Sequence, residues 1–314
     1  MAPDVSSTPS TTTAGSASPH STAAGAMPGW RDWLSAARPH TWYNALAPVL
    51  AGAAAARATG MLSLPRLFLA LVVAWALVVG VNFANDYSDG IRGTDGKDRT
   101  GPGRLTGSGT ADPIYVRWAA FAFFGLAAAA GVGLALMTSP WLILVGLLCI
   151  TAAWFYTGGD NPYGYRGFGE VAVFCFFGLV AVLGTQYTQI HRITLTGVAL
   201  AVAVGCFSAS INLANNLRDI PTDRRAGKNT LAVILGDQAT RKLWLALTVV
   251  PYVAIPLAAI SGTGALIGFM ALPVSIAAAA PVTGNKTGTD LVAVLSLAGK
   301  AMLIYTVAIL IGIA

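Results

Sequence analysis

Residues 82–89 read Asn-Phe-Ala-Asn-Asp-Tyr-Ser-Asp and directly follow an apolar run, residues 67–81, that contains only hydrophobic residues and one glycine. Because a helix needs about 20 apolar residues to cross a bilayer, this stretch predicts a membrane-spanning helix with carboxylates at its end. Carboxylates at such positions are costly and usually face a polar cavity. At about 100° per residue, Asn82, Asp86 and Asp89 fall within about 60° of arc, so they form one polar stripe.

A second stretch of this kind, residues 212–223 (NLANNLRDIPTD), follows another apolar run. Its amides and carboxylates project within about 100° of arc. Polar contacts between membrane helices could account for some of them, but five on one face exceed that need. Carboxylate and amide oxygens suit Mg²⁺, which often bridges protein carboxylates to substrate phosphates. The two stretches therefore predict opposed metal-binding stripes with the ligands Asn82, Asp86, Asp89, Asn215, Asp219 and Asp223.

The composition is that of an integral membrane protein. Of the 314 residues, 55% are hydrophobic and only 10% are charged, and the mean hydropathy is +0.66; soluble domains carry about 25% charged residues. Residues 1–28 are rich in Ser, Thr, Ala, Pro and Gly, so we expect a disordered tail, followed by a single membrane domain at 29–314. A short interfacial helix is expected over residues 30–37, where apolar residues recur at helical spacing.

The apolar runs predict an all-α bundle of nine membrane helices around a central cavity. Of the 19 Lys and Arg residues, 15 then lie on the side of the N-terminus, 3 on the other side and 1 within a span. By the positive-inside rule, the N-terminus and both polar stretches are expected on the cytoplasmic side of the cell membrane. The predicted spans are 41–58, 66–88, 115–137, 140–157, 169–188, 194–217, 242–261, 263–282 and 290–312.

Further candidate residues lie next to the two polar stretches. Basic side chains in the same loops could bind phosphates, although the positive-inside rule alone also places cations there. The loop at 156–168 is rich in Tyr and Gly, which predicts an aromatic cap over the site; an interfacial aromatic belt is the alternative. The predicted substrate-binding residues are Arg38, Asn44, Asn82, Asn85, Lys97, Arg99, Arg104, Tyr156, Tyr165, Arg166, Asn215 and Lys228.

These features together predict a substrate with a diphosphate head and a long apolar tail. Two Mg²⁺ ions bridging the diphosphate would make it a better leaving group, with Asp86, Asp89, Asp219 and Asp223 as the catalytic carboxylates. An ion or metal transporter is the alternative from a different class, and it would place acidic groups near the bilayer midplane on broken helices. Nothing in the pattern indicates nucleic-acid binding or a particular oligomeric state.

At these residues the chain resembles the UbiA-type intramembrane prenyltransferases, whose hallmark is a pair of Asn/Asp-rich motifs on two helices. Three stretches resemble the branch that prenylates 1,4-dihydroxy-2-naphthoate in menaquinone synthesis: RPHTWYNALAPVLAG from Arg38, NFANDYSDGIRGTD from Asn82 and NNLRDIPTDRRAGKNTLAVILG from Asn215. The resemblance implies transfer of a polyprenyl group from its diphosphate to that acceptor with loss of CO₂, giving demethylmenaquinone. The same chemistry with 4-hydroxybenzoate or homogentisate as the acceptor remains the alternative.

Overall fold

The structure is a computed structural model that describes residues 28–60, 62–93 and 104–313, all of them in helices, turns or loops. Seven helices in this part of the chain are long and apolar enough to cross a membrane. Three of these seven membrane-length helices consist of successive segments of different helical type. The seven are α3 (Leu64–Ile91), α4 (Pro113–Leu136), α6–η3–α7 (Gly169–Ile190), α8 (Leu195–Arg225), α10 (Asp237–Ala258), η5–α11 (Thr263–Thr283) and η6–α12 (Gly288–Gly312).

The two other predicted spans, 41–58 and 140–157, are helical but shorter than expected. They correspond to α2 (Tyr43–Arg57) with 15 residues and α5 (Leu142–Phe155) with 14, against the roughly 20 of a full span. The expected interfacial helix is α1 (Trp30–Ala36), and nearly all of the predicted tail lies outside the described residues. The remaining bounds are η1 (Pro39–Thr41), η2 (Tyr163–Tyr165), α6 (Gly169–Val173), η3 (Phe174–Leu183), α7 (Gly184–Ile190), α9 (Leu231–Leu235), η4 (Ala259–Ser261), η5 (Thr263–Ala271), α11 (Leu272–Thr283), η6 (Gly288–Leu291) and α12 (Val292–Gly312).

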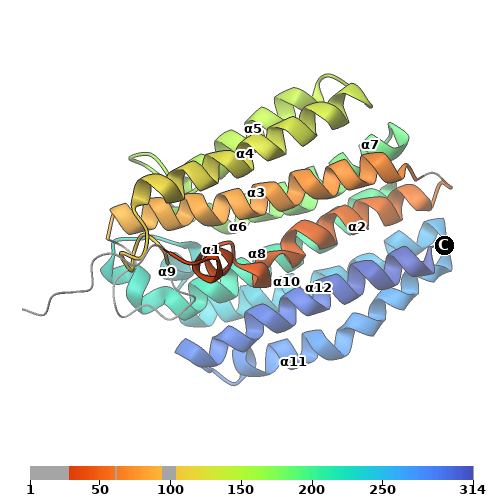
Figure 1. The fold of residues 1–314 in the computed structure, drawn as a ribbon. Coiled ribbons are helices and arrows are strands. Elements are labelled where there is room, and N and C mark those ends of the chain that lie inside the picture. Colours follow the sequence, from red (N-terminus) through yellow and green to blue (C-terminus); the bar gives the residue numbers. More distant parts are fainter. Residues whose placement is uncertain (1–27, 61, 94–103, 314) are drawn as a thin grey trace, which may run out of the picture.

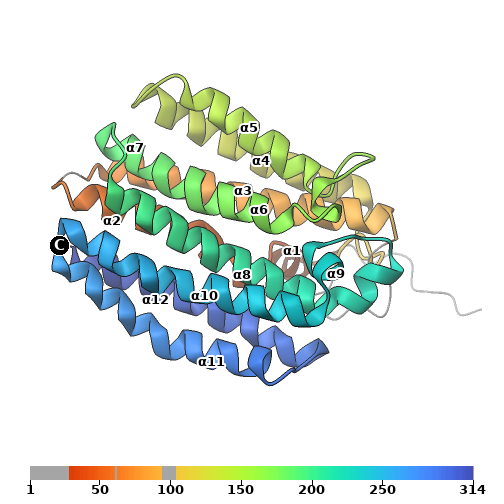
Figure 2. The ribbon, with the colours of Figure 1, turned by 180° about the vertical axis from the view of Figure 1, so that it is seen from behind.

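The long helices lie side by side around α8 (Figure 1). The most apolar window of α8 is 83% buried, compared with 28% to 50% for the other six membrane-length helices. In both views α4 and α5 form one flank of the bundle and α11 forms the other (Figures 1 and 2). The apolar part of α8, which precedes the second polar stretch, is therefore surrounded by protein.

Glycines allow the central helices to approach closely, as is typical of membrane bundles. A Cβ atom on Gly178 would lie 2.6 Å from the Cα atom of Gly205, and one on Gly52 would lie 2.4 Å from the carbonyl oxygen of Val182. Gly178 lies in η3, a ten-residue π-helical stretch, and π-helical segments occur frequently at functional sites. Any larger residue at Gly178 would push η3 away from α8.

Both polar stretches lie at the same end of the bundle. α3 and α8 both end there, near α1 and α9, whereas both helices begin at the opposite end (Figure 1). Asp86 and Asp89 lie in the last two turns of α3, and Asp219 and Asp223 in the last two turns of α8. This arrangement differs from the midplane acids on broken helices that a transporter would require.

Candidate functional site

Asp89, on the last turn of α3, is a buried carboxylate bound by two loops. Its Oδ1 accepts a hydrogen bond of 2.5 Å from the Tyr165 hydroxyl, and its Oδ2 lies 3.2 Å from Nη2 of Arg104. Only 6% of the Asp89 surface is exposed. A buried carboxylate requires such partners because removing an ion from water is costly. Asp89 therefore joins α3 to the loops that carry Arg104 and Tyr165, as the prediction of a shared site requires.

Asp86 makes a different set of contacts one turn earlier. Its Oδ2 accepts the backbone N–H of Leu105 and its Oδ1 accepts that of Thr106, both at 2.9 Å, and only 1% of the residue is exposed. The loop packs tightly here, since a Cβ on Gly90 would lie 2.4 Å from the methyl carbon of Thr106. The carboxylate of Asp86 thus fixes the backbone next to Arg104.

The two asparagines of this stretch point in different directions. Nδ2 of Asn82 donates to the carbonyl of Ala37 at 3.1 Å and to the Thr41 hydroxyl at 3.0 Å, which lie in the segment before α2. Oδ1 of Asn85 accepts from the Thr157 hydroxyl at 2.7 Å, in the loop after α5. Asn85, which is not part of the predicted stripe, thus has a different neighbour from Asn82.

The second polar stretch forms a compact ion-pair network on α8. Arg218 donates to both carboxylate oxygens of Asp219, at 2.7 and 2.6 Å, and to Oδ1 of Asn215 at 2.9 Å. Asp223, one turn further on, accepts from the Thr230 hydroxyl at 3.5 Å and lies 3.8 Å from Nζ of Lys228. Each carboxylate is thus matched by a cation from the same segment of chain.

Tyr165 connects the two acidic stretches. Besides its hydroxyl contact to Asp89, its carbonyl oxygen accepts the backbone N–H of Asn229 at 3.0 Å. Its ring lies 5.0 Å from Nζ of Lys228 and 5.6 Å from the guanidinium of Arg92; contacts of this kind between a cation and a ring face are attractive. The ring therefore lies between the C-terminal ends of α3 and α8, where the aromatic loop was predicted to act.

A buried carboxylate that we had not predicted lies beside this region. Oε1 of Glu170 accepts hydrogen bonds from Nδ2 of Asn216 at 2.7 Å and of Asn212 at 3.2 Å. The Tyr156 hydroxyl donates to Oδ1 of Asn212 at 3.4 Å, which links this group to the aromatic loop. Within the described chain Oε2 of Glu170 has no hydrogen-bond partner.

Several predicted residues are not placed in the site by recorded contacts. Lys97 and Arg99 lie outside the described residues, and Arg166 is exposed. Asn44 lies in the first turn of α2, where its Oδ1 is buried and has no partner among the described residues. Arg38 is half-buried in left-handed backbone before η1, with φ of 52°.

Two site residues were missed in the sequence analysis. Arg92 donates to the carbonyls of Thr157 and Gly159 and so holds the aromatic loop against α3. In the sequence, the positive-inside rule alone could explain this arginine. Glu170 was not among the predicted site residues. A carboxylate within two residues of a long apolar run was the available signal, because such a group needs buried partners.

The loop residue Tyr163 is a neutral hydrogen-bond donor. Its hydroxyl donates to the carbonyl of Ala152 at 2.8 Å, and burial raises the pKa of Tyr163 to about 12. Its ring meets that of Tyr156 edge to face, with centroids 5.5 Å apart. The aromatic loop is thereby anchored at its start as well as at Tyr165.

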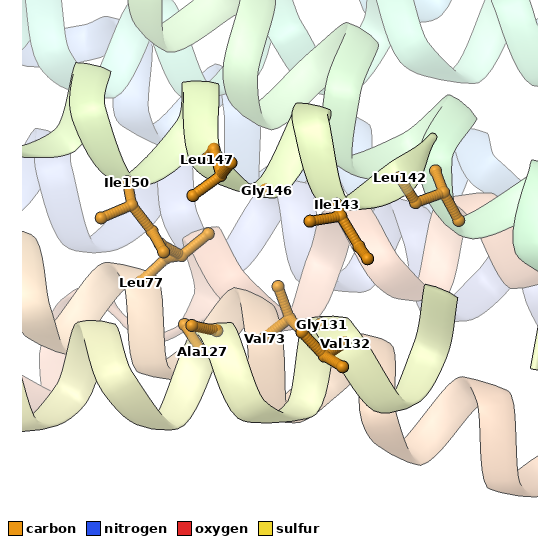
Figure 3. A pocket seen from close by; sticks show the side chains of 11 residues that line it. Val73, Leu77, Ala127, Gly131, Val132, Leu142, Ile143, Gly146, Leu147 and Ile150 are labelled. Carbon is orange, nitrogen blue, oxygen red and sulfur yellow. The ribbon is translucent and has the colours of Figure 1, made fainter. Parts of the chain in front are cut away.

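An apolar pocket lies between α3, α4 and α5, away from the polar stretches (Figure 3). It has a volume of about 80 Å³ and is lined by aliphatic residues and glycines, among them Val73, Leu77 and Ile150. None of the predicted site residues lines it. It is a gap between membrane helices and not part of the polar site.

The donor set fits a hard cation. Asn85, Asp89, Asn215, Asp219 and Asp223 offer only oxygen ligands, which Mg²⁺ prefers over nitrogen and sulfur. Among the described residues, no three His, Cys, Asp or Glu side chains already converge on one point. The two motifs could therefore hold cations together with a bridging anion, such as a diphosphate, between them.

Comparisons with known proteins identify the family of this chain. Residues 45–311 match the model of the UbiA prenyltransferase family. The chain is 52% identical over 283 residues to the 1,4-dihydroxy-2-naphthoate octaprenyltransferase of Mycobacterium tuberculosis, covering 90% of this chain and 97% of that protein. The protein of the same name from Escherichia coli is 36% identical, covering 67% and 70%.

Solved structures share the fold at low sequence identity. The apo UbiA homolog from Aeropyrum pernix has a TM-score of 0.67 at 17% identity, covering 87% of this chain and 98% of that one. The homolog from Archaeoglobus fulgidus bound to GPP and Mg²⁺ has a TM-score of 0.60 at 16% identity, covering 89% and 99%. On the family model and the sequence relatives together, this chain belongs to the UbiA prenyltransferase family.

Proposed function

We propose that the chain transfers a polyprenyl group from a polyprenyl diphosphate to 1,4-dihydroxy-2-naphthoate with loss of CO₂, giving the reduced (quinol) form of demethylmenaquinone. One observation carries the choice of acceptor: the M. tuberculosis relative named for this reaction is 52% identical over almost the full length of both chains. The solved homolog bound to GPP and Mg²⁺ supports an allylic diphosphate as donor and a divalent metal as cofactor.

The proposed site combines the C-terminal turns of α3 and α8. Asn85 and Asp89 would hold one Mg²⁺ ion, and Asn215, Asp219 and Asp223 a second, with the diphosphate between them. Bound there, the ions would neutralise the diphosphate and make it a better leaving group. The metal-ligand role predicted for Asn82 and Asp86 is not part of this proposal, because their recorded contacts hold the segment before α2 and the loop at 104–106.

The basic residues would stabilise the negative charge that develops on the departing diphosphate. Arg104 and Arg218 are already held beside the carboxylates, through contacts to Asp89 and Asp219. A guanidinium placed beside the diphosphate can bind phosphate oxygens through charge-assisted hydrogen bonds. Lys228 is placed to do the same near Asp223, and we propose further phosphate contacts for Lys97, Arg99, Arg38 and Arg166.

The aromatic loop would cap the site and exclude water from the allylic cation. Tyr165 joins it to Asp89, Arg92 joins it to α3, and Tyr156 joins it to α8 through Asn212. The ring carbon that bears the acceptor's carboxylate bonds to the allylic cation. The bond to the carboxylate then breaks, and its electron pair restores the aromatic ring as CO₂ leaves.

The membrane arrangement is proposed as follows. α2 and α5 complete a bundle of nine spans, although each is shorter than the bilayer core. The polar end of the bundle faces the cytoplasm, because the basic residues gather there. Asn44, near the start of α2, would then lie just inside the membrane and face the acceptor or the donor tail.

The test is a transfer assay on purified protein in detergent with Mg²⁺, a polyprenyl diphosphate and either 1,4-dihydroxy-2-naphthoate or 4-hydroxybenzoate. We expect a prenylated, decarboxylated naphthoquinol, identified by mass, and no product with 4-hydroxybenzoate. Product only with 4-hydroxybenzoate would overturn the acceptor but keep the reaction class. Absence of product with both acceptors and with a series of donor lengths would contradict the proposal.

A further inference from the structure

A polar cleft lies at the end of the bundle opposite the candidate site. It has a volume of about 420 Å³ and is lined by Thr59, Arg66, Gln189, Ile190, His191 and Arg192. These residues come from the region after α2, the start of α3 and the end of α7, which lie together at that end (Figures 1 and 2). We refer to it as the Arg66 cleft.

The residues of the Arg66 cleft are held in position by contacts between the helix ends. Nη1 of Arg66 donates to the carbonyl of Thr188 at 3.1 Å and lies 3.5 Å from Nε2 of His191. His191 adopts a left-handed backbone conformation, with φ of 54°, and its backbone N–H donates to the carbonyl oxygen of Tyr187 at 2.8 Å. Both contacts of Arg66 use Nη1, so Nη2 and Nε have no protein partner in the described chain.

The side-chain amide nitrogen of Gln189 is a buried donor that lacks a hydrogen-bond partner among the described residues. Oε1 of Gln189 accepts the backbone N–H of Ser63 at 2.7 Å, so the other terminal atom of the side chain must be the amide nitrogen. That nitrogen is buried and lacks a hydrogen-bond partner among the described residues, and the residue is only 5% exposed. Buried polar groups are normally satisfied, so an acceptor from outside the chain is expected here.

The charge of the cleft selects an anion. Arg66 and Arg192 are cationic, and Arg57 lies nearby at the end of α2. The segments that form this end contain no acidic residue: the sequence has no Asp or Glu at 33–85, at 113–159 or at 171–218. Two guanidinium groups and an amide donor without a carboxylate partner match the oxygens of a phosphate group.

Neighbouring aromatic residues place the cleft at headgroup depth. Trp141 donates to the Tyr187 hydroxyl at 3.3 Å, and the ring of Tyr187 lies 5.7 Å from that of His191. Half of the Trp141 surface, 51%, is exposed. Trp and Tyr concentrate where the bilayer core meets water, so a phosphate in the cleft would lie at the level of lipid headgroups.

We propose that the Arg66 cleft binds the phosphate of an anionic phospholipid, through Arg66, Arg192 and the amide of Gln189. The proposal concerns the end of the bundle remote from the proposed active site and does not depend on the reaction. A zwitterionic headgroup would bring its own cation towards the two arginines and is expected to bind more weakly.

The test measures lipid retention by native mass spectrometry on the purified full chain, titrated with phosphatidylglycerol, phosphatidylcholine or inorganic phosphate. Arg66→Gln and Arg192→Gln should each weaken phosphatidylglycerol binding about tenfold or more. Arg57→Gln is the matched control, because it removes the same charge from the same end but does not line the cleft; it should change binding less than about twofold. Arg192 is exposed and has no recorded side-chain contact, so its replacement should leave folding intact.

A third variant tests the buried amide directly. Gln189→Glu keeps the acceptor for Ser63 and the shape of the side chain but places a negative charge in the cleft, so phosphatidylglycerol binding should fall about tenfold or more. Equal retention of phosphatidylcholine, or equal losses in Arg57→Gln and Arg66→Gln, would overturn the proposal. Displacement of the lipid by millimolar inorganic phosphate would show that the cleft binds free phosphate and not a phospholipid.

Discussion

Replacing Asp86 with Asn tests whether this carboxylate positions the loop at 104–106 or ligates metal. In the wild type each carboxylate oxygen accepts a backbone N–H at 2.9 Å. Asn keeps one acceptor and turns an NH₂ group towards the other backbone N–H. The loss of one charge-assisted bond, with a buried donor left unsatisfied, costs about 2–4 kcal/mol. The cost falls on the loop, because the membrane helices retain their own packing.

Hydrogen exchange measured by mass spectrometry on the protein in detergent is the direct assay. A local loss of 2–4 kcal/mol should accelerate exchange of the Leu105 and Thr106 amides about 30- to 700-fold. Asp89→Asn is the matched control on the same helix; because Asp89 contacts this loop only through the Arg104 side chain, it should accelerate exchange of these two amides much less, and it should weaken binding of Mg²⁺ with the diphosphate. If Asp86→Asn left exchange unchanged and weakened metal binding as much as Asp89→Asn, the positioning role would be refuted.

Four further predictions concern the site, its metal and the N-terminal tail. Tyr165→Phe removes the hydroxyl bound to Asp89 and should lower kcat about tenfold or more, whereas Tyr163→Phe, whose hydroxyl lies elsewhere, should change it little; equal effects would contradict the site. Glu170→Ala should destabilise the protein by about 2–4 kcal/mol, because the amides of the buried Asn216 and the half-buried Asn212 lose their acceptor, and Glu170→Gln by less; thermal unfolding in detergent distinguishes them. EDTA should abolish transfer and Mg²⁺ should restore it, and activity that persisted in EDTA would remove the metal from the mechanism. Deletion of residues 2–26 should leave kcat and KM unchanged, so a loss of activity would show that the tail takes part.

The fold could be predicted largely from hydropathy. Uninterrupted apolar runs identify membrane helices directly, because the backbone in a bilayer must satisfy its own hydrogen bonds, and seven of the nine predicted spans are confirmed. Hydropathy predicted the lengths of the helices less well. α2 and α5 have 15 and 14 residues, and each begins and ends one or two residues inside the predicted spans 41–58 and 140–157. Where an apolar helix ends depends on the loops packed against it, which hydropathy does not contain.

The candidate site was predicted at the level of helix faces but not of contacts. Asn82, Asp86 and Asp89 do share one side of α3, yet a 60° arc is wide enough to meet several neighbours. Asn82 meets the segment before α2, Asp86 meets loop amides, and Asp89 meets Arg104 and Tyr165. Helical projection assigns a direction to each side chain, whereas its partner is set by segments up to 76 residues away. The sequence therefore predicts which helix ends carry the polar residues, whereas the partner of each residue on α3 depends on loops that fold against that helix.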